Sequence, residues 1–152
     1  MIYAALIGLL AAVDLYFKNL IEKQEPGSFP RPLVHTKEKI MLHHNHNAGF
    51  PFGFLQKHGA VVRTVPLVIV SGLTGVLCYL IPKEGKTLQK VSLAMVIGGA
   101  LSNLYDRLVR RYVVDYFSFQ LGSLKKVVFN LGDIFVFLGS GILMALEMFR
   151  KN

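Results

Sequence analysis

The chain has 152 residues, enough for one domain, and 53% of them are hydrophobic, which is too apolar for an ordinary soluble domain. Its net charge of +8 would suit nucleic acid, but the basic residues stand between long apolar runs, which is typical of membrane-flanking loops. No nucleic-acid partner is therefore predicted. The single cysteine, Cys78, excludes an internal disulfide and lies in an apolar run, where packing is its expected role.

Four apolar segments approach the length of about 20 residues that a helix needs to cross a bilayer. They cover approximately residues 1–21, 60–81, 88–106 and 127–149. The first has no basic start and is interrupted by Asp14 and Lys18, so we interpret it as a retained helix rather than a cleaved signal peptide. The sequence thus predicts an all-α integral membrane protein with four transmembrane helices, in a single membrane domain over residues 1–152.

Ionisable side chains inside the first segment are costly at bilayer depth unless they are paired. Asp14 and Lys18 are four residues apart and share one helical face, so they can form a salt bridge. We favour this structural interpretation for both residues.

Three histidines crowd into four positions of HHNHNAGFPFG, residues 43–53. Adjacent His43 and His44 would point to opposite faces of a strand. His43 and His46 lack the four-residue helical spacing of the best-known two-histidine zinc motif. No metal site is predicted here, even with His35 and His58 counted as distant ligands.

The third segment ends in charged residues. Asp106 and Arg107 follow Gly98, Gly99 and Ala100, small residues that let a neighbouring helix approach closely. The two charged residues could cap a helix end at the headgroups or belong to a functional site. The sequence leaves both interpretations open.

Asp115 and Asp133 are stronger candidates for a functional site than Asp106 and Arg107. Asp115 lies in YVVDYFSFQ, whose alternating β-branched and aromatic residues predict a short strand or extended segment. Asp133 lies near the start of the fourth span, and the intervening LGSLKK lets the chain turn back and bring the carboxylates together. One of two carboxylates in a dry site stays protonated, so the pair offers a base to activate water and an acid to protonate a leaving amine.

These residues alone are compatible with two kinds of membrane protein. One is an aspartyl hydrolase, and the other is a proton-coupled transporter, since transporters also use membrane carboxylates. Transporters usually contain an internal repeat, and none is visible in this sequence.

Charge does not decide the orientation of the four spans. The side with the termini and the turn 82–90 carries five Lys and Arg residues, and the side with loops 22–59 and 107–126 carries ten. A positive-inside count would place the two longer loops in the cytoplasm. The charge per residue favours the opposite orientation, because the turn 82–90 is dense in lysine.

Several ordered motifs resemble the prolipoprotein signal peptidases, also called signal peptidase II. The family's Gly-Gly-Ala-x-Gly-Asn-x-x-Asp-Arg, Val-Val-Asp-Phe and Phe-Asn-x-Ala-Asp are similar to GGALSNLYDRLVRRYVVDYFSF followed by FNLGD. Upstream, its Asp-x-x-x-Lys is matched by DLYFK, and its Asn-x-Gly-x-x-Phe by NAGFPFGFL. The order and spacing of these motifs agree over nearly the whole chain.

The resemblance implies four transmembrane helices, a small extramembrane β-sheet between the first two and a short interfacial helix before the last. It implies an intramembrane aspartyl endopeptidase without a cofactor, which removes the signal peptide of lipid-modified bacterial prolipoproteins by cleaving before the diacylglyceryl-cysteine. The chain would be a multi-pass protein of the bacterial cytoplasmic membrane, with cytoplasmic termini and its active site toward the outer face. Its partners would be the prolipoprotein and membrane lipids, and we expect a monomer.

The resemblance also implies roles for single residues. Asp115 and Asp133 would be the catalytic dyad, and Asp14, Lys18 and Gly99 would be structural. Residues that contact the substrate or support the site would be Asn47, Gly49, Asn103, Asp106, Arg107 and Asn130.

The chain departs from the family pattern beside these positions. The departures are Phe50, Pro51, Ser102, Arg111 and Gly132. Because all acid, amide and arginine positions are kept, the departures should affect substrate fit more than chemistry, although Gly132 could loosen the backbone beside Asp133. They motivate an alternative, a non-peptidase membrane homologue that binds lipoprotein or lipid.

Overall fold

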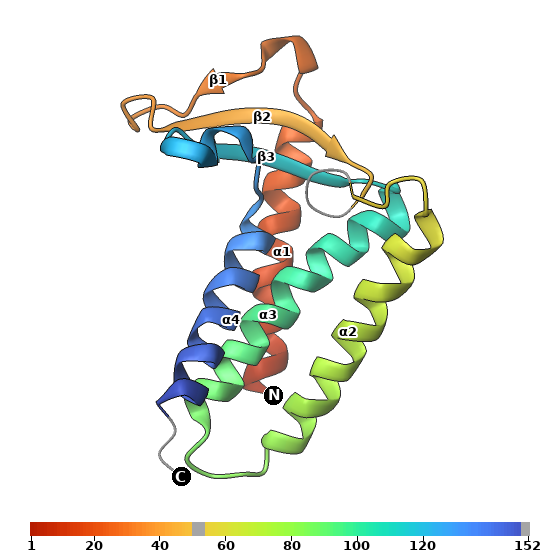
Figure 1. The fold of residues 1–152 in the computed structure, drawn as a ribbon, viewed down its shortest axis with the longest axis vertical. Helices are drawn as coiled ribbons and strands as arrows, with labels where there is room; N and C mark the ends of the chain where they lie inside the picture. The colour runs from red at the N-terminus through yellow and green to blue at the C-terminus, as the bar shows by residue number, and fades with distance from the viewer. Residues whose placement is uncertain (50–53, 150–152) are drawn as a thin grey trace.

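The computed structural model describes residues 1–49 and 54–149 and shows an elongated helical bundle with a small sheet at one end (Figure 1). The helices of the bundle are α1 (Ile2–Glu22), α2 (Gly59–Leu80), α3 (Thr87–Tyr105) and α4 (Leu131–Met148). The N-terminus, the α2–α3 turn and the C-terminal end of α4 lie together at the end opposite the sheet (Figure 1).

Three helices in the described part of the chain, α1, α2 and α4, are long and apolar enough to cross a membrane. The predicted helices over 1–21, 60–81 and 88–106 agree with α1, α2 and α3 to within one residue at each end. The predicted start of the fourth at residue 127 is wrong, because α4 begins only at Leu131. Residues before it are extended, with Phe129 bridged to Phe117 of the neighbouring strand.

The third helix is the centre of the bundle, since α3 packs against α1, α2 and α4. This position explains its more polar sequence. Lys90, Ser92, Ser102 and Asn103 are all buried on α3, where other parts of the chain cover them. The outer helices instead expose large apolar side chains, as Val68 and Ile69 of α2 illustrate.

Close contact between α3 and α4 depends on two glycines. A Cβ atom added at Gly99 would overlap the carbonyl oxygen of Gly132. A Cβ atom added at Gly132 would lie 2.8 Å from the Gly99 oxygen and 2.9 Å from Asp14 Oδ2. The backbones can approach this closely only because both positions lack a side chain.

The sheet contains β1 (Arg31–Pro32), β2 (Ile40–Asn47) and β3 (Val113–Phe119), antiparallel in the order β1-β2-β3. Two of its strands lie between the first two long helices as expected, but β3 comes from the segment after α3. It is the strand predicted around Asp115.

Short helices connect these elements. The structure has η1 (Pro26–Ser28), the π-helix η3 (Asp106–Arg110) and the 3-10 helix η4 (Gly122–Lys126). The short helix expected before the last span corresponds to η4, which turns the chain from β3 back toward α4.

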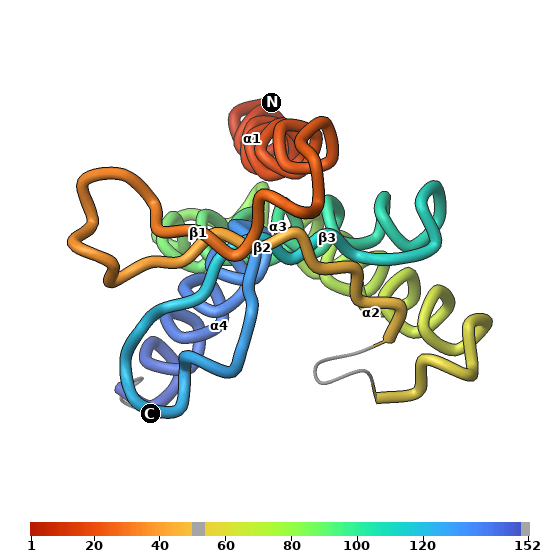
Figure 2. The backbone as a smooth tube through the Cα atoms, turned by 90° about the horizontal axis from the view of Figure 1, so that it is seen from above, coloured from red at the N-terminus to blue at the C-terminus, as the bar shows by residue number. Residues whose placement is uncertain are grey.

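An apolar cluster attaches the sheet to the bundle. Ile21 at the end of α1 packs with Val114, Tyr116 and Phe117 of β3, and Phe129 joins them. Seen from the sheet end, the strands run across the ends of the helices between α1 and α4 (Figure 2). This packing brings the middle of β3 to the first turn of α4.

Candidate active site

Asp115 lies in the middle of β3 with only 5% of its surface exposed. Its two carboxylate oxygens accept hydrogen bonds from side-chain amides. The Asn130 Nδ2 donates to Oδ1 over 2.8 Å, and the Asn47 Nδ2 donates to Oδ2 over 3.3 Å. Asn47 stands at the end of β2, so the pairing of β2 with β3 positions Asn47 near Asp115.

Asp133 lies in the first turn of α4, where its carboxylate accepts two hydrogen bonds. Asn103 Nδ2 of α3 donates to Oδ1 over 2.9 Å, and the backbone N–H of Asn130 donates to Oδ2 over 3.2 Å. The Asp133 N–H in turn donates to Asn130 Oδ1 over 2.9 Å, which completes a reciprocal capping box. The cap of α4 therefore also orients Asp133.

Asn130 joins the two aspartates through one side chain. Its amide oxygen accepts from the Asp133 backbone, and its amide nitrogen donates to Asp115. The residue is fully buried, so neither bond competes with bulk water. As the sequence predicted, the turn between β3 and α4 brings Asp115 and Asp133 together.

Both aspartates line one cavity of about 570 Å³ at the sheet end of the bundle. Asn47, Asn103 and Arg107 contribute polar groups to its wall. Apolar residues complete the lining on the side of η4 and α4: Val127, Val128, Phe129 and Phe137. A cavity with a few converging polar groups among apolar walls is typical of a small catalytic or binding site.

Arg107 and Gly49 meet beside this cavity. The Arg107 guanidinium donates to the carbonyl oxygen of Gly49 over 3.4 Å and to that of Asn103 over 3.3 Å. The Gly49 N–H donates to Asn47 Oδ1 over 3.0 Å, which leaves the Asn47 amide nitrogen directed at Asp115. The structure thus brings the predicted residues Asn47, Gly49 and Arg107 to the aspartates.

Burial raises the pKa of Asp115 to about 7, and the neighbouring charge of Asp133 adds to this rise. The hydrogen bonds from Asn130 and Asn47, together with the more distant Lys18, act in the opposite direction. Near neutral pH Asp115 therefore exists both with and without its proton, as an acid–base group requires.

A buried lysine of α1, Lys18, is hydrogen-bonded to a residue that contacts Asp133. Lys18 Nζ is fully buried and lies 2.8 Å from Asp14 Oδ2 and 3.1 Å from Asp106 Oδ2. It also donates to Asn103 Oδ1 over 2.7 Å. An ammonium group can only donate, so this bond directs the amide nitrogen of Asn103 toward Asp133. The predicted Asp14–Lys18 salt bridge is confirmed, and it belongs to a network that reaches the aspartates.

Tyr116 is a member of this network that sequence reasoning missed. Its hydroxyl donates to Asp14 Oδ1 over 3.0 Å and accepts the Leu131 N–H over 3.1 Å, so it ties β3 to α1 and α4. Neighbouring residues of a strand face opposite sides, which places Tyr116 opposite Asp115. The alternation in YVVDYFSF is the sequence signal that could have indicated this position of Tyr116.

Asp106 and Arg107 lie in different surroundings. Asp106 is fully buried and accepts from the Val114 N–H over 3.1 Å and from Arg110 over 2.7 Å, so it links η3 to β3. Arg107 faces the cavity instead.

The described departures from the family pattern occupy distinct structural positions. Ser102 Oγ donates to Asp14 over 2.6 Å and accepts from Lys18 over 3.1 Å. Arg111 has a φ of 74°, a left-handed conformation that favours glycine. Gly132 lies inside α4 against Gly99. The other departures, Phe50 and Pro51, lie outside the described residues.

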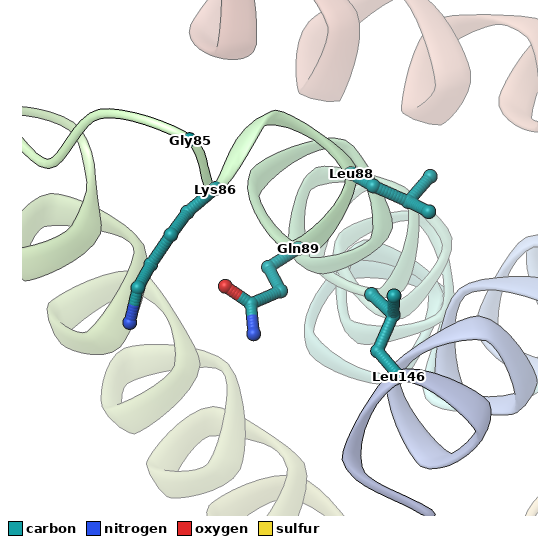
Figure 3. Close-up of a pocket in the computed structure, with 5 residues that line it drawn as sticks. All are labelled: Gly85, Lys86, Leu88, Gln89 and Leu146. Carbon is teal, nitrogen blue, oxygen red and sulfur yellow. The ribbon is translucent and has the colours of Figure 1, made fainter. Parts of the chain in front are cut away.

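A second hollow lies at the opposite end of the bundle, beside the α2–α3 turn (Figure 3). It is lined by Gly85, Lys86, Leu88, Gln89 and Leu146. No carboxylate is among these described residues, so this hollow lacks the acid–base pair of the first cavity.

The profile of the family described as Signal peptidase (SPase) II matches residues 6–150. The chain belongs to the signal peptidase II family. This confirms the resemblance drawn from the motifs.

Curated relatives within the signal peptidase II family come from bacteria. The lipoprotein signal peptidase of Pasteurella multocida (strain Pm70) is 38% identical over 108 residues, which cover 70% of this chain and 65% of that protein. That of Burkholderia mallei (strain SAVP1) is 37% identical over 106 residues, which cover 69% and 64%. The chain therefore matches slightly less than two thirds of the length of these relatives.

Solved structures share the fold of this signal peptidase II family member. Two bacterial membrane enzymes determined by the in meso method, at 2.3 Å and 1.9 Å resolution, each superpose with a TM-score of 0.81. The first is 18% identical and covers 96% of this chain and 87% of its own, and the second is 16% identical and covers 98% and 94%. The apolar helices and these relatives together indicate a bacterial membrane protein.

Proposed function

We propose that this chain is a lipoprotein signal peptidase that acts as an intramembrane aspartyl endopeptidase. It cleaves lipid-modified bacterial prolipoproteins just before the diacylglyceryl-cysteine and releases the signal peptide. The observation that carries this proposal is the pair of aspartates joined by Asn130 in one cavity at the end of an apolar helix bundle. Membership of the signal peptidase II family supports the same activity.

The surroundings of the two aspartates suggest how they divide the chemistry. Asp133 lies in the first turn of α4, where the helix dipole and two N–H donors favour a carboxylate. Asp115 lies on a strand with its pKa raised to about 7 by burial and by Asp133, so we assign the proton to Asp115. Asp133 then takes a proton from water, the hydroxide adds to the scissile carbonyl, and Asp115 gives its proton to the carbonyl oxygen. Collapse of this adduct breaks the C–N bond: Asp133 gives its proton to the leaving amine, and a hydroxyl group of the adduct returns a proton to Asp115.

Polar groups in the cavity wall can hold the substrate for this reaction. The amide of Asn47 and the guanidinium of Arg107 offer donors to backbone carbonyls of an extended peptide. The apolar wall around Phe129 and Phe137 suits the lipid-modified side of the cleavage site. No cofactor takes part in this proposal.

The membrane arrangement completes the proposal. Residues 1–152 form a single membrane domain. In addition to α1, α2 and α4, α3 also spans the membrane, because it has a similar length and lies among them. Both termini are cytoplasmic, and the sheet and the aspartates lie at the outer face of the bacterial cytoplasmic membrane. The protein acts as a monomer on prolipoprotein and membrane lipids, without nucleic acid.

The test is cleavage of a lipid-modified precursor by purified variants in detergent. Asp115→Asn and Asp133→Asn should each abolish cleavage while the protein still accumulates in the membrane. Glu38→Gln, which removes an exposed carboxylate from a distant turn, should cleave like the unchanged protein. Full cleavage by both aspartate variants would overturn the proposal. Intact precursor with the unchanged protein would favour the non-peptidase homologue.

A further inference from the structure

Three potential metal ligands converge where the end of α1 meets β2, and one of them, His46, also lines the cavity of the two aspartates. Glu22, at the end of α1, accepts on Oε1 from His44 Nε2 and His46 Nε2, each over 2.8 Å. One ligand atom from each residue lies within 4.8 Å of the others. The proposed peptidase reaction uses none of these side chains.

The strand explains why these two histidines meet. His44 and His46 are two residues apart on β2, so their side chains project from the same face. Their rings lie 5.1 Å apart, with His46 stacked on Tyr112 at 3.9 Å. The spacing arguments from the sequence concerned His43 with His44 and His43 with His46, not His44 with His46. His43 instead faces away and contacts Ser118 over 2.8 Å.

The chemistry of this set suits a zinc ion. Two imidazole nitrogens and one carboxylate oxygen are a known zinc ligand set, which leaves a fourth position for water. Zinc bonds of about 2.0–2.2 Å place tetrahedral ligand atoms about 3.3 Å apart, so the present 2.8 Å contacts need to open only slightly. The Tyr112 hydroxyl donates to Glu22 Oε2 over 2.9 Å and would orient the carboxylate from behind.

The site is also reachable and partly preformed. The His46 side chain is 44% exposed, whereas those of Glu22 and His44 are 22% and 7% exposed. An ion can therefore enter beside His46, while the more buried His44 holds its position.

We propose that Glu22, His44 and His46 bind one zinc ion, which cross-links the end of α1 to β2. The next residue after His46 is Asn47, whose side chain contacts Asp115. Zinc would therefore stabilise the strand that carries Asn47. The proposal does not depend on the peptidase activity.

Zinc binding can be measured on purified protein that carries an affinity tag without histidine. Competition against a fluorescent zinc chelator should show one zinc per chain. His46→Ala and Glu22→Gln should each weaken binding at least tenfold. His43→Ala is the matched control, because it removes a histidine from the opposite face of the same strand, and it should bind like the unchanged protein. Because His44 is nearly buried, His46→Ala is the decisive variant even if His44→Ala does not fold.

Two further measurements sharpen the test. X-ray absorption of the zinc-loaded protein should show two imidazole ligands, and Tyr112→Phe should weaken binding by about 10- to 100-fold, as loss of a carboxylate-orienting group does in other sites. Zinc should raise the Tm, and magnesium should not, since imidazole is a poor magnesium ligand. Equal zinc affinity in His46→Ala, equal loss in His43→Ala or an equal Tm rise with magnesium would overturn the proposal.

Discussion

Asn130 concentrates two tasks in one side chain. It caps α4 through its amide oxygen and fixes Asp115 through its amide nitrogen. A capping side chain contributes about 1 kcal/mol to stability, and a hydrogen bond to a charged group about 1.5–3 kcal/mol. The two contributions can be separated by substitution, because serine can cap a helix but has no amide to reach Asp115.

We expect Asn130→Ala to lower both stability and activity. The unfolding free energy should fall by about 2.5–4 kcal/mol, the sum of the cap and the hydrogen bond to Asp115, and cleavage should slow by roughly 10- to 100-fold. Asn130→Ser should recover about 1 kcal/mol of this stability through its cap but lose activity to the same extent. Thermal unfolding in detergent and single-turnover cleavage measure the two effects. Normal cleavage by Asn130→Ser would show that the bond to Asp115 is dispensable.

The raised pKa of Asp115 makes a second prediction, for pH dependence. Its folded-state pKa is about 7, above an ordinary value of about 3.9, so the folded chain holds the proton more tightly than the unfolded chain. The stability from this proton is complete below about pH 4 and is lost as the pH rises through 7. Activity that needs a protonated Asp115 should decline over the same upper range.

Melting curves between pH 5 and 8 test whether stability falls as the pH rises. The Tm of the unchanged protein should fall with rising pH more steeply than that of Asp115→Asn, which has no proton to lose at this position. Glu38→Gln should retain the slope of the unchanged protein. Parallel slopes for Asp115→Asn and the unchanged protein would contradict the assignment.

At the scale of elements, the contact between α3 and α4 decides where Asp133 stands. Gly99 of α3 and Gly132 of α4 let the two backbones touch. Gly132 directly precedes Asp133, and Gly99 lies four residues before Asn103. The Asn103–Asp133 hydrogen bond therefore depends on a close helix contact that a Cβ atom at Gly99 would disturb.

Gly99→Ala should therefore reduce stability and activity together. Its Cβ atom would overlap the Gly132 carbonyl, and such overpacking costs about 1–3 kcal/mol. Gly72→Ala, in α2, is the matched control, because a Cβ atom there has no neighbour within 4 Å and alanine favours a helix. Thermal unfolding and cleavage assays should show loss only for Gly99→Ala. Equal behaviour of the two variants would mean that α3 and α4 can separate without consequence.

At the scale of the whole molecule, several of the charges counted for the orientation are engaged inside the fold. Arg110 is paired with Asp106, and Arg107 faces the cavity, so neither acts as a free loop charge. Lys90 donates to the carbonyl oxygens of Ile81 and Lys83 and closes the α2–α3 turn.

Labelling of single cysteines tests the proposed orientation. With Cys78 replaced by alanine, Leu121→Cys lies at the sheet end and Glu84→Cys in the α2–α3 turn, both exposed. A membrane-impermeant maleimide should label Leu121→Cys in intact spheroplasts and Glu84→Cys only after lysis. The reverse pattern would place the aspartates at the cytoplasmic face.

The sequence by itself determined the long helices, the strand around Asp115 and the aspartate pair, because apolar runs, alternation and motif order are local signals. The start of α4 was missed by four residues, since the Phe117–Phe129 bridge that extends this segment is a tertiary contact.

Only the tertiary structure decided how distant residues meet. Lys18 reaches Asp133 through Asn103, Tyr116 ties β3 to α1 and α4, and Glu22 joins His44 and His46. Each contact spans many residues of chain and depends on which faces of helices and strands pack together. Spacing along the sequence carries periodicity within one element, but it does not specify the side chains that a neighbouring element will present.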